Sequence, residues 1–186
     1  MKKKIFAGLS ALALVLSMPF IPASVSAENT ASEVKINETN FPDVNFRNFV
    51  LTGYSGVFYN PGQKIDYDND GWLSPAEIAA VTEIYCDGQE IGDLTGIGYF
   101  TALEKLDCSR NQLTELDVRE NTALKWLLCS GNQLTELNVR ENTALTELEC
   151  NSNQLTELDV SKNEALTWLS CSYNQLATLD VSKNEA

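Results

Sequence analysis

From Leu103 to Ala186 the chain repeats itself every 21 residues. The copies are LEKLDCSRNQLTELDVRENTA, LKWLLCSGNQLTELNVRENTA, LTELECNSNQLTELDVSKNEA and LTWLSCSYNQLATLDVSKNEA, and a diverged copy that is one residue longer precedes them at residues 81–102. A unit of this length cannot bury an apolar face alone, whereas stacked units bury a continuous core. The periodicity therefore predicts a coil of stacked repeats.

Each copy contains an alternating stretch and a second apolar cluster. In LEKLDCS the apolar Leu106 and Cys108 alternate with polar residues, which is the period of a strand. We expect both side chains to point into the core and the intervening ones to point outward. Leu113, Leu116 and Val118 then return on the opposite side of the coil and close the core.

The pattern L-x-x-L-x-C-x-x-N-x-L-x-x-L-x-V resembles that of bacterial leucine-rich repeat proteins, in the variant with Cys where many members have Leu. The resemblance covers residues 81–186. It implies an α/β solenoid, a right-handed coil with one parallel strand in every repeat. Such proteins look like secreted or surface binders of host proteins or glycans, often with a small helical cap in front. Some secreted bacterial enzymes carry such repeats as a non-catalytic part.

Two asparagine columns recur at the bends of the repeat. An amide at a bend can donate to and accept from the curved backbone, and can pair with the copies above and below. The first column follows the strand: Asn111, Asn132, Asn153 and Asn174. The second is predicted to act similarly at the other bend: Asn121, Asn142, Asn163 and Asn184.

The cysteines form a third column, spaced 22, 21, 21 and 21 residues apart: Cys86, Cys108, Cys129, Cys150 and Cys171. A metal cluster is disfavoured because its ligands must converge on a point, whereas these form a line. Disulfides suit an exported chain. In-register strands, however, hold Cβ atoms about 4.8 Å apart and parallel, beyond the ~3.8 Å of bridged pairs. We therefore predict buried free thiols that belong to the core.

Residues 1–27 have the pattern of a secretory signal peptide, with a basic start, an apolar run and a small-residue site that predicts cleavage after Ala27. The alternative, an uncleaved membrane anchor, needs about 18 apolar residues, more than this run has. Removal of the leader would change the formal charge from −13 to −16. This charge argues against nucleic acid and membrane surfaces as partners. We therefore expect a mature chain that is secreted or held at the cell surface, without membrane insertion.

Residues 28–80 are predicted to form a small helical cap in front of the repeats. The first expected helix has Asn40 as its candidate N-cap, and its apolar face consists of Phe46, Phe49 and Val50. The second expected helix begins in SPAE as a capping box, with Ser74 as the N-cap, Pro75 at the first helical position and Glu77 as the partner.

The segment DYDNDGWLSPAE, residues 66–77, matches the calcium loop of an EF-hand. Alternate residues of an extended stretch point to one side, so three carboxylates converge, and a turn at Gly71 brings the helix start round to the ion. The predicted calcium ligands are Asp66, Asp68, Asp70, the backbone carbonyl of Trp72, Ser74 and Glu77. The predicted fold class is thus a leucine-rich repeat solenoid preceded by a small helical EF-hand-like cap, with structural calcium as the expected cofactor.

Two departures from an EF-hand favour a structural site over a sensor. Pro61 and Gly62 interrupt the incoming helix, so we expect an extended incoming arm, and no second EF-hand pairs with this one. The affinity we expect is that of extracellular modules, on the order of 10⁻⁴ to 10⁻³ M. The alternative is a capping box with a solvated acidic turn, which leaves three aspartates repelling one another without any gain.

An enzyme is disfavoured by what the chain lacks: it has no histidine, no nucleophile motif and no phosphate-binding glycine loop. We therefore predict a binding module. The alternative is a spacer, or a non-catalytic repeat region of a larger secreted enzyme or surface protein. A spacer should repeat its outward residues, whereas those of this chain vary, as drift or a binding role would produce. Position 3 of the copies reads Glu83, Lys105, Trp126, Glu147 and Trp168.

The predicted ligand-binding residues lie on the outward strand face: Trp126, Leu128, Trp168 and Tyr173. The two indoles belong to copies two strand spacings apart, about 10 Å, with Glu147 and Glu149 between them. Tryptophan anchors protein interfaces and its flat face suits sugar rings, so the partner is predicted to be a protein or a glycan. Isolated surface aromatics are also common without any function.

The chain stops at Ala186, where the pattern requires another leucine. An uncovered last coil would expose a strand edge and apolar side chains. We therefore expect that the sequence belongs to a longer protein or that the chain self-associates through this end.

Overall fold

The computed structural model describes residues 32–53 and 64–186. The predicted cleavage site after Ala27 and the predicted extended arm around Pro61 and Gly62 lie outside the described residues, so both stay predictions. Residues 31–186 form one compact unit. The other unit, residues 1–30, contains none of the described residues.

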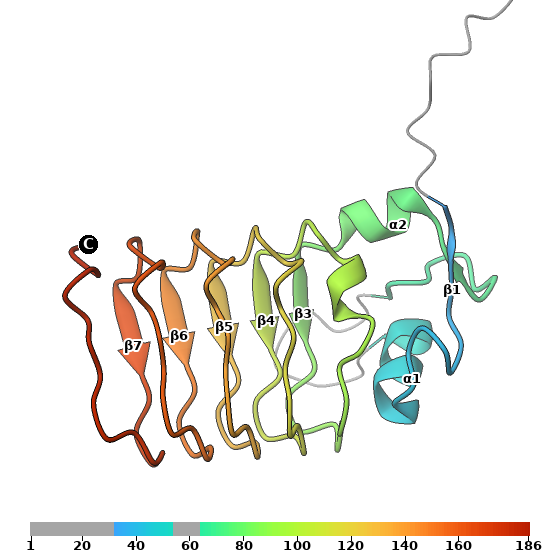
Figure 1. The fold of residues 1–186 in the computed structure, drawn as a ribbon. Coiled ribbons are helices and arrows are strands. Elements are labelled where there is room, and N and C mark those ends of the chain that lie inside the picture. The colour runs from blue at the N-terminus through green and yellow to red at the C-terminus, as the bar shows by residue number, and fades with distance from the viewer. Residues whose placement is uncertain (1–31, 54–63) are drawn as a thin grey trace, which may run out of the picture. The chain divides into compact units, whose positions relative to one another are not determined.

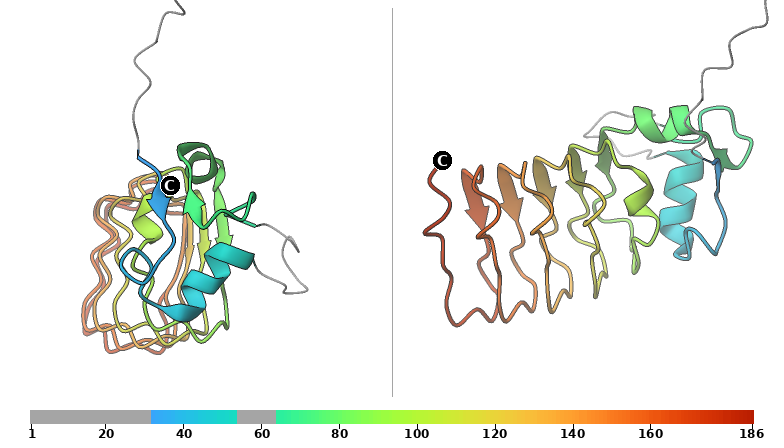
Figure 2. Two further views of the ribbon diagram at one scale, coloured as in Figure 1. Left: turned by 90° about the vertical axis from the view of Figure 1, so that its right-hand side faces the viewer. Right: turned by 45° about the horizontal axis from the view of Figure 1, so that its top comes forward.

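A sheet of five parallel strands runs along one side of the coil, with its strands in sequence order (Figure 1). Each repeat supplies one strand of three residues: β3 (Glu83–Tyr85), β4 (Lys105–Asp107), β5 (Trp126–Leu128), β6 (Glu147–Glu149) and β7 (Trp168–Ser170). Successive turns of the coil superimpose when viewed along its length (Figure 2). The predicted parallel-sheet repeat coil is confirmed.

The strand register follows the repeat without a slip. Leu106 pairs with Ile84 on one side and with Leu127 on the other, and the later strands continue the same column. Leu106 and Cys108 are buried, and Leu113, Leu116 and Val118 face them from the other side of the coil. The inward and outward faces are therefore those that the alternation predicted, because one core has to be shared by all copies.

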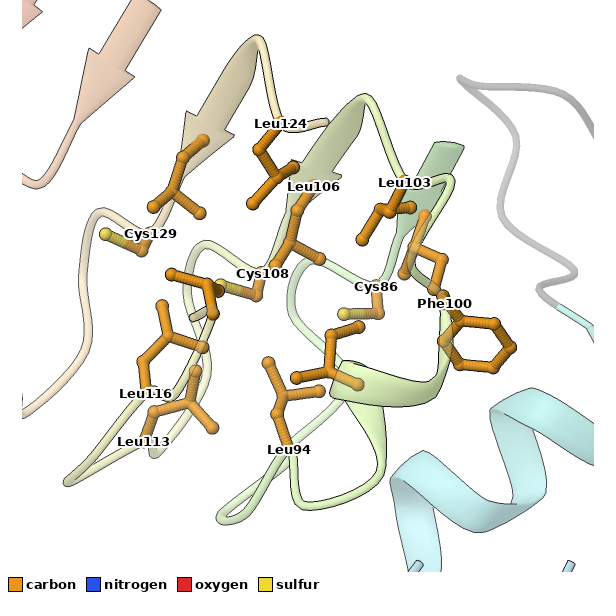
Figure 3. Packing of buried hydrophobic residues seen from close by; sticks show 14 of the residues in the cluster. Cys86, Leu94, Phe100, Leu103, Leu106, Cys108, Leu113, Leu116, Leu124 and Cys129 are labelled. Carbon is orange, nitrogen blue, oxygen red and sulfur yellow. The ribbon is translucent and has the colours of Figure 1, made fainter. Parts of the chain in front are cut away.

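Four of the five cysteines are fully buried in this core, and Cys171 is half-buried. Figure 3 shows Cys86, Cys108 and Cys129 in line among the leucines of the coil interior. All five are free thiols, as predicted. Burial raises the pKa of the Cys108 and Cys129 thiols well above the ordinary range and that of Cys150 to about 12. The thiolate is the reactive form, so burial makes these side chains chemically inert.

Thiol reactivity should therefore separate Cys171 from the other four. With 5,5′-dithiobis(2-nitrobenzoate) at pH 8, we expect one thiol to react rapidly in the native protein and all five in denaturant, because buried thiols are neither ionised nor accessible. Cys171→Ser should remove the rapid phase, whereas Cys129→Ser should leave it unchanged. Rapid modification of several thiols in the native state would contradict the buried column.

The first asparagine column ties each turn to its neighbours. The Asn132 side chain donates from Nδ2 to the carbonyls of Cys108 and Cys129, both at 3.0 Å. Its Oδ1 accepts the backbone N–H of Leu113, also at 3.0 Å. The predicted donation and acceptance are confirmed. The partners in the neighbouring copies are backbone groups and not the equivalent asparagine side chains.

Among the described residues, the asparagine side chains of the second column form hydrogen bonds through their nitrogen atom only. Nδ2 of the fully buried Asn142 donates to the carbonyls of Val118 and Asn121, both at 2.9 Å. Within the described part of the chain, the buried Oδ1 atoms of this column have no hydrogen-bond partner: Asn121, Asn142, Asn163 and Asn184. The two columns are alike in sequence, but they differ in the hydrogen bonds that they form.

Every copy bends through a left-handed residue at its eighth position. In two copies this residue is glycine, Gly88 at φ 64° and Gly131 at φ 71°. In the others it is Arg110, Ser152 or Tyr173, at φ between 53° and 56°. Glycine adopts this conformation without strain, whereas other residues do so at a cost. Variation at this position thus reflects a backbone requirement as well as any binding role.

The cap consists of two short helices and a two-stranded ribbon. These are α1 (Val44–Thr52), α2 (Pro75–Ala80), and β1 (Val34–Lys35) paired antiparallel with β2 (Trp72–Leu73). A short 3₁₀ turn, η1 (Ile97–Tyr99), follows in the first repeat. One hydrophobic cluster extends from Ile36 in the cap to Leu166 in the last repeat, so cap and coil share a core.

The N-cap of α1 is Asp43, and the prediction of Asn40 was wrong. Asp43 Oδ1 accepts the backbone N–H groups of Asn45 and Phe46, at 2.8 and 2.9 Å. Its other carboxylate oxygen accepts the N–H of Gly92 in the first repeat at 2.8 Å. The position of the helix N-cap therefore depends partly on a contact between Asp43 and the coil. Asn40 instead donates to the carbonyl of Lys35.

Candidate functional site

The acidic loop is compact and lies directly before β2 and α2. One carboxylate oxygen from each of Asp66, Asp68 and Asp70 lies within 4.8 Å of the other two. Asp66 is buried, whereas the other two are exposed to solvent. The predicted convergence of three carboxylates on one side of the loop is therefore present.

The loop backbone wraps around the first aspartate. Asp66 accepts the N–H of Asn69 at 2.8 Å and the N–H of Gly71 at 3.2 Å. Gly71 turns the chain at φ 81°. This left-handed conformation is strained for residues that carry a side chain, but not for glycine. Asp70 accepts the N–H of Trp72 at 2.7 Å, where the chain enters β2. These contacts hold the carboxylates in place through local backbone groups.

Glu77 closes the loop from the far end. Its Oε1 accepts the N–H of Tyr67 at 3.0 Å, and its Oε2 accepts both the N–H and the hydroxyl of Ser74 at 2.8 Å. Ser74 in turn accepts the N–H of Glu77, which completes the predicted capping box with Pro75 in the first turn. The glutamate thus joins the beginning of the loop to its end.

Uncompensated negative charge is the main electrostatic feature of this loop. Asp66 and Glu77 are 1% and 2% exposed, and neither forms an ion pair within residues 32–53 and 64–186. The pKa of Asp68 is raised, first by desolvation and then by the charges of Asp70 and Glu77, although a hydrogen bond from the Asp70 backbone opposes this. Buried carboxylates without a cation are unfavourable, so a bound cation fits the site.

The ribbon of β1 and β2 anchors the loop to the rest of the cap. Lys35 pairs with Trp72, and its Nζ lies 5.4 Å from the centroid of the indole ring. The N–H of Ile36 donates to the carbonyl of Gly71 at 3.0 Å. Sequence reasoning missed β1, because two residues carry no periodicity and their partner strand lies far along the chain.

The strand face places the predicted aromatic residues as the register required. Trp126 and Trp168 each pair with Glu147, so β6 stands between the two indoles. The indoles are 42% and 59% exposed, and Tyr173 beyond β7 is 86% exposed. Leu128 is half-buried beside them. Trp126 and Trp168 thus lie on β5 and β7, on either side of β6, on one solvent-facing surface.

Lys105 is a member of this face that sequence reasoning did not single out. Its Nζ lies 2.8 Å from Glu83 and 4.5 Å from the centroid of the Trp126 ring. The Lys105 hydrogen bond lowers the pKa of Glu83, and the same contact raises the pKa of Lys105. The sequence could have indicated this contact. Position 3 of the first three copies reads Glu, Lys and Trp, and in-register strands place residues at the same position of successive copies side by side.

A cavity of about 510 Å³ lies where the cap meets the first copies. Its lining includes Tyr99, Asn40 and the acidic side chains Glu115, Asp117 and Glu120. Asp117 is paired with Arg119, which lowers the pKa of its carboxyl group. The residues of the described ranges that line the cavity include neither a cysteine nor a lysine.

The 21-residue turns, the parallel sheet and the shared core define the class of protein, a leucine-rich repeat coil. The chain is similar to Internalin J of Listeria monocytogenes, with 37% identity over 106 residues, which is 57% of this chain and 10% of the relative. The solved functional domain of that protein, described as including a cysteine ladder, superposes with a TM-score of 0.69 and 37% identity, over 82% of this chain and 31% of that one.

A second internalin of the same organism, InlF, shares the fold, with a TM-score of 0.57 and 19% identity over 82% of this chain and 48% of that one. No protein-family model matches the sequence. The chain therefore spans about a tenth of the curated relative and less than half of either solved structure. In the described residues, no helix combines the length and the apolar character that crossing a bilayer requires.

Proposed function

We propose that the chain is the binding region of a secreted or cell-surface bacterial protein, and that it recognises a host protein or a glycan through its strand face. The observation that carries this proposal is the pair of exposed indoles that flank β6 in register. Tryptophan is among the residues most enriched at the energetic centre of protein interfaces. The similarity to Internalin J and the signal-like leader support the proposed location.

The same face argues against a spacer as the main role. A spacer needs only the inward columns, which form the core, and gains nothing from indoles held in solvent. The outward residues of position 3 differ from copy to copy, whereas the buried leucines beside them recur. The alternative is a non-catalytic repeat region of a larger secreted enzyme or surface protein.

We further propose that the acidic loop holds a calcium ion as a structural support of the cap. Calcium prefers oxygen ligands in a flexible shell of six to eight, and the loop supplies carboxylate, hydroxyl and backbone oxygens. Its ligands would be Asp66, Asp68, Asp70, Trp72 through its carbonyl, Ser74 and Glu77. The support for this proposal is the burial of the Asp66 and Glu77 carboxylates, which form no ion pair with any residue that the structure describes.

The double substitution Trp126→Ala and Trp168→Ala tests the binding surface. Partners are first captured with the wild-type chain from glycan and host-protein arrays, and affinities are then measured by biolayer interferometry. We expect the double variant to bind the captured partner at least about tenfold more weakly, because buried tryptophans at interfaces each contribute about 2 kcal/mol or more.

The matched control is Glu136→Ala with Glu157→Ala, two exposed side chains outside the strands. The control should bind normally, and circular dichroism should show all variants folded, because neither indole is buried. Normal binding by the tryptophan variant would place the site elsewhere on the molecule. Unfolding of that variant would mean that the rings belong to the core.

A further inference from the structure

We infer that the strand face binds a cationic side chain of a partner protein, an arginine guanidinium or a lysine ammonium, between Trp126 and Trp168 and above Glu147 and Glu149. The inference rests on the proposed function, because it names the partner chemistry of the same surface. It commits to a basic protein segment over a neutral glycan.

The molecule already contains this contact once. Lys105 of β4 lies between Glu83 of β3 and Trp126 of β5, with its Nζ 2.8 Å from the carboxylate and 4.5 Å from the ring centroid. An ammonium group is therefore held by a carboxylate from one neighbouring strand and an indole from the other. Cations within about 6 Å of an indole centroid are attracted by the negative face of the ring.

The next position along the face has the same elements without the cation. Trp126 and Trp168 flank Glu147, and Glu149 lies two residues further along β6 on the same side of the sheet. Both glutamates are half-buried, and neither forms an ion pair in the part of the chain that the structure describes. Two adjacent carboxylates of β6 are thus without an ion-pair partner among the described residues, and that of Glu147 lies between two aromatic residues.

The dimensions suit a single cationic group. Two strand spacings separate the flanking strands by about 10 Å, so a group above β6 stands about 5 Å from either. This is close to the 4.5 Å that separates the Lys105 Nζ from the Trp126 ring one strand away. A cation at this position offsets part of the negative charge of the two carboxylates while it contacts both indoles, whereas a neutral ligand leaves that charge uncompensated. The charge of the whole chain, −13, favours the same kind of partner.

The indole N–H signals of the folded protein test the inference directly. The chain has three tryptophans, so Trp126 and Trp168 can be followed while Trp72 in the cap serves as the internal reference. The probes are N-acetyl-arginine amide and its neutral isostere N-acetyl-citrulline amide, added to the millimolar range with calcium present. We expect the arginine probe to shift the Trp126 and Trp168 signals, and the citrulline probe to leave them in place.

Substitution of the carboxylates supplies the second part of the test. Glu147→Gln with Glu149→Gln should lower the affinity for the arginine probe about two- to five-fold, which is the range for exposed charge contacts. Glu136→Gln with Glu157→Gln removes the same charge elsewhere and should leave the affinity unchanged. Higher salt should weaken binding in the wild-type chain.

The failure of this inference differs from the failure of the proposed function. If N,N′-diacetylchitobiose or citrulline shifts both indoles as strongly as arginine does, the face binds ligands but not by charge, and the cationic inference is overturned. It is also overturned if arginine shifts neither indole, or if both glutamine pairs weaken it equally. The proposed binding function is decided separately, by the tryptophan double variant and its captured partner.

Discussion

Asn132→Ala should lower the free energy of unfolding by about 3 kcal/mol, the upper range for a buried group left without its partner. The substitution removes three hydrogen bonds. The carbonyls of Cys108 and Cys129 keep bonds from the asparagines of the adjoining copies. The N–H of Leu113, buried in the core, is left unpaired, because Asn132 Oδ1 is the partner that the structure gives it.

Asn142→Ala should cost less, about 1 kcal/mol. The two carbonyls that Asn142 contacts also accept backbone N–H groups, that of Val118 from Asn121 and that of Asn121 from Leu124. No buried donor is orphaned, and an unpaired Oδ1 is removed. The neighbouring exposed Gln133→Ala serves as the matched control and should be nearly neutral. Urea denaturation followed by circular dichroism measures all three, and equal losses at Asn132 and Asn142 would contradict this account.

Calcium at about 10 mM should raise the unfolding free energy by about 2.7 kcal/mol, if the dissociation constant lies near 10⁻⁴ M and the ligand is in hundredfold excess. For a chain of this size, that corresponds to a rise in Tm of roughly 5 to 10 °C. The cause is the neutralisation of buried carboxylates that lack an ion pair in the described residues, Asp66 and Glu77. Differential scanning calorimetry with calcium and with chelator measures the shift.

Asp68→Asn is the sharpest variant for this site. In the wild type, desolvation and then the charges of Asp70 and Glu77 raise the pKa of the Asp68 carboxyl group, so its ionised form is disfavoured. Without calcium, the neutral amide should therefore be no less stable than wild type, while the calcium response should be mostly lost. Because a raised pKa lets protons compete at higher pH, the wild-type response should also weaken as the pH is lowered.

Two further variants frame the calcium test. Glu77→Gln should lose the response too, but it should also be destabilised without calcium, because the amide nitrogen cannot accept a hydrogen bond where a carboxylate oxygen does. Glu136→Gln, an exposed carboxylate far along the chain, should respond as wild type does. An unchanged Tm and no calorimetric heat at millimolar calcium would leave the segment as a capped acidic turn.

The repeat coil was predictable from the sequence because its information is redundant. The same apolar spacing occurs in copy after copy, and a one-residue slip would turn every Leu106-type residue into solvent, so period alone determines the register. The cysteine column follows from the same argument. The capping box of α2 was predictable for a different reason, since Ser74 and Glu77 satisfy each other within one helical turn.

Only the tertiary structure decided the features that join distant segments. Asp43 caps α1 while it also reaches Gly92, and Lys105 lies against Trp126 because two copies place them on adjacent strands. The two asparagine columns, identical in type and spacing, differ in that one pairs its Oδ1 and the other does not. Local sequence states which groups a residue carries, but the partner of each group depends on which backbone the fold brings within about 3 Å of it.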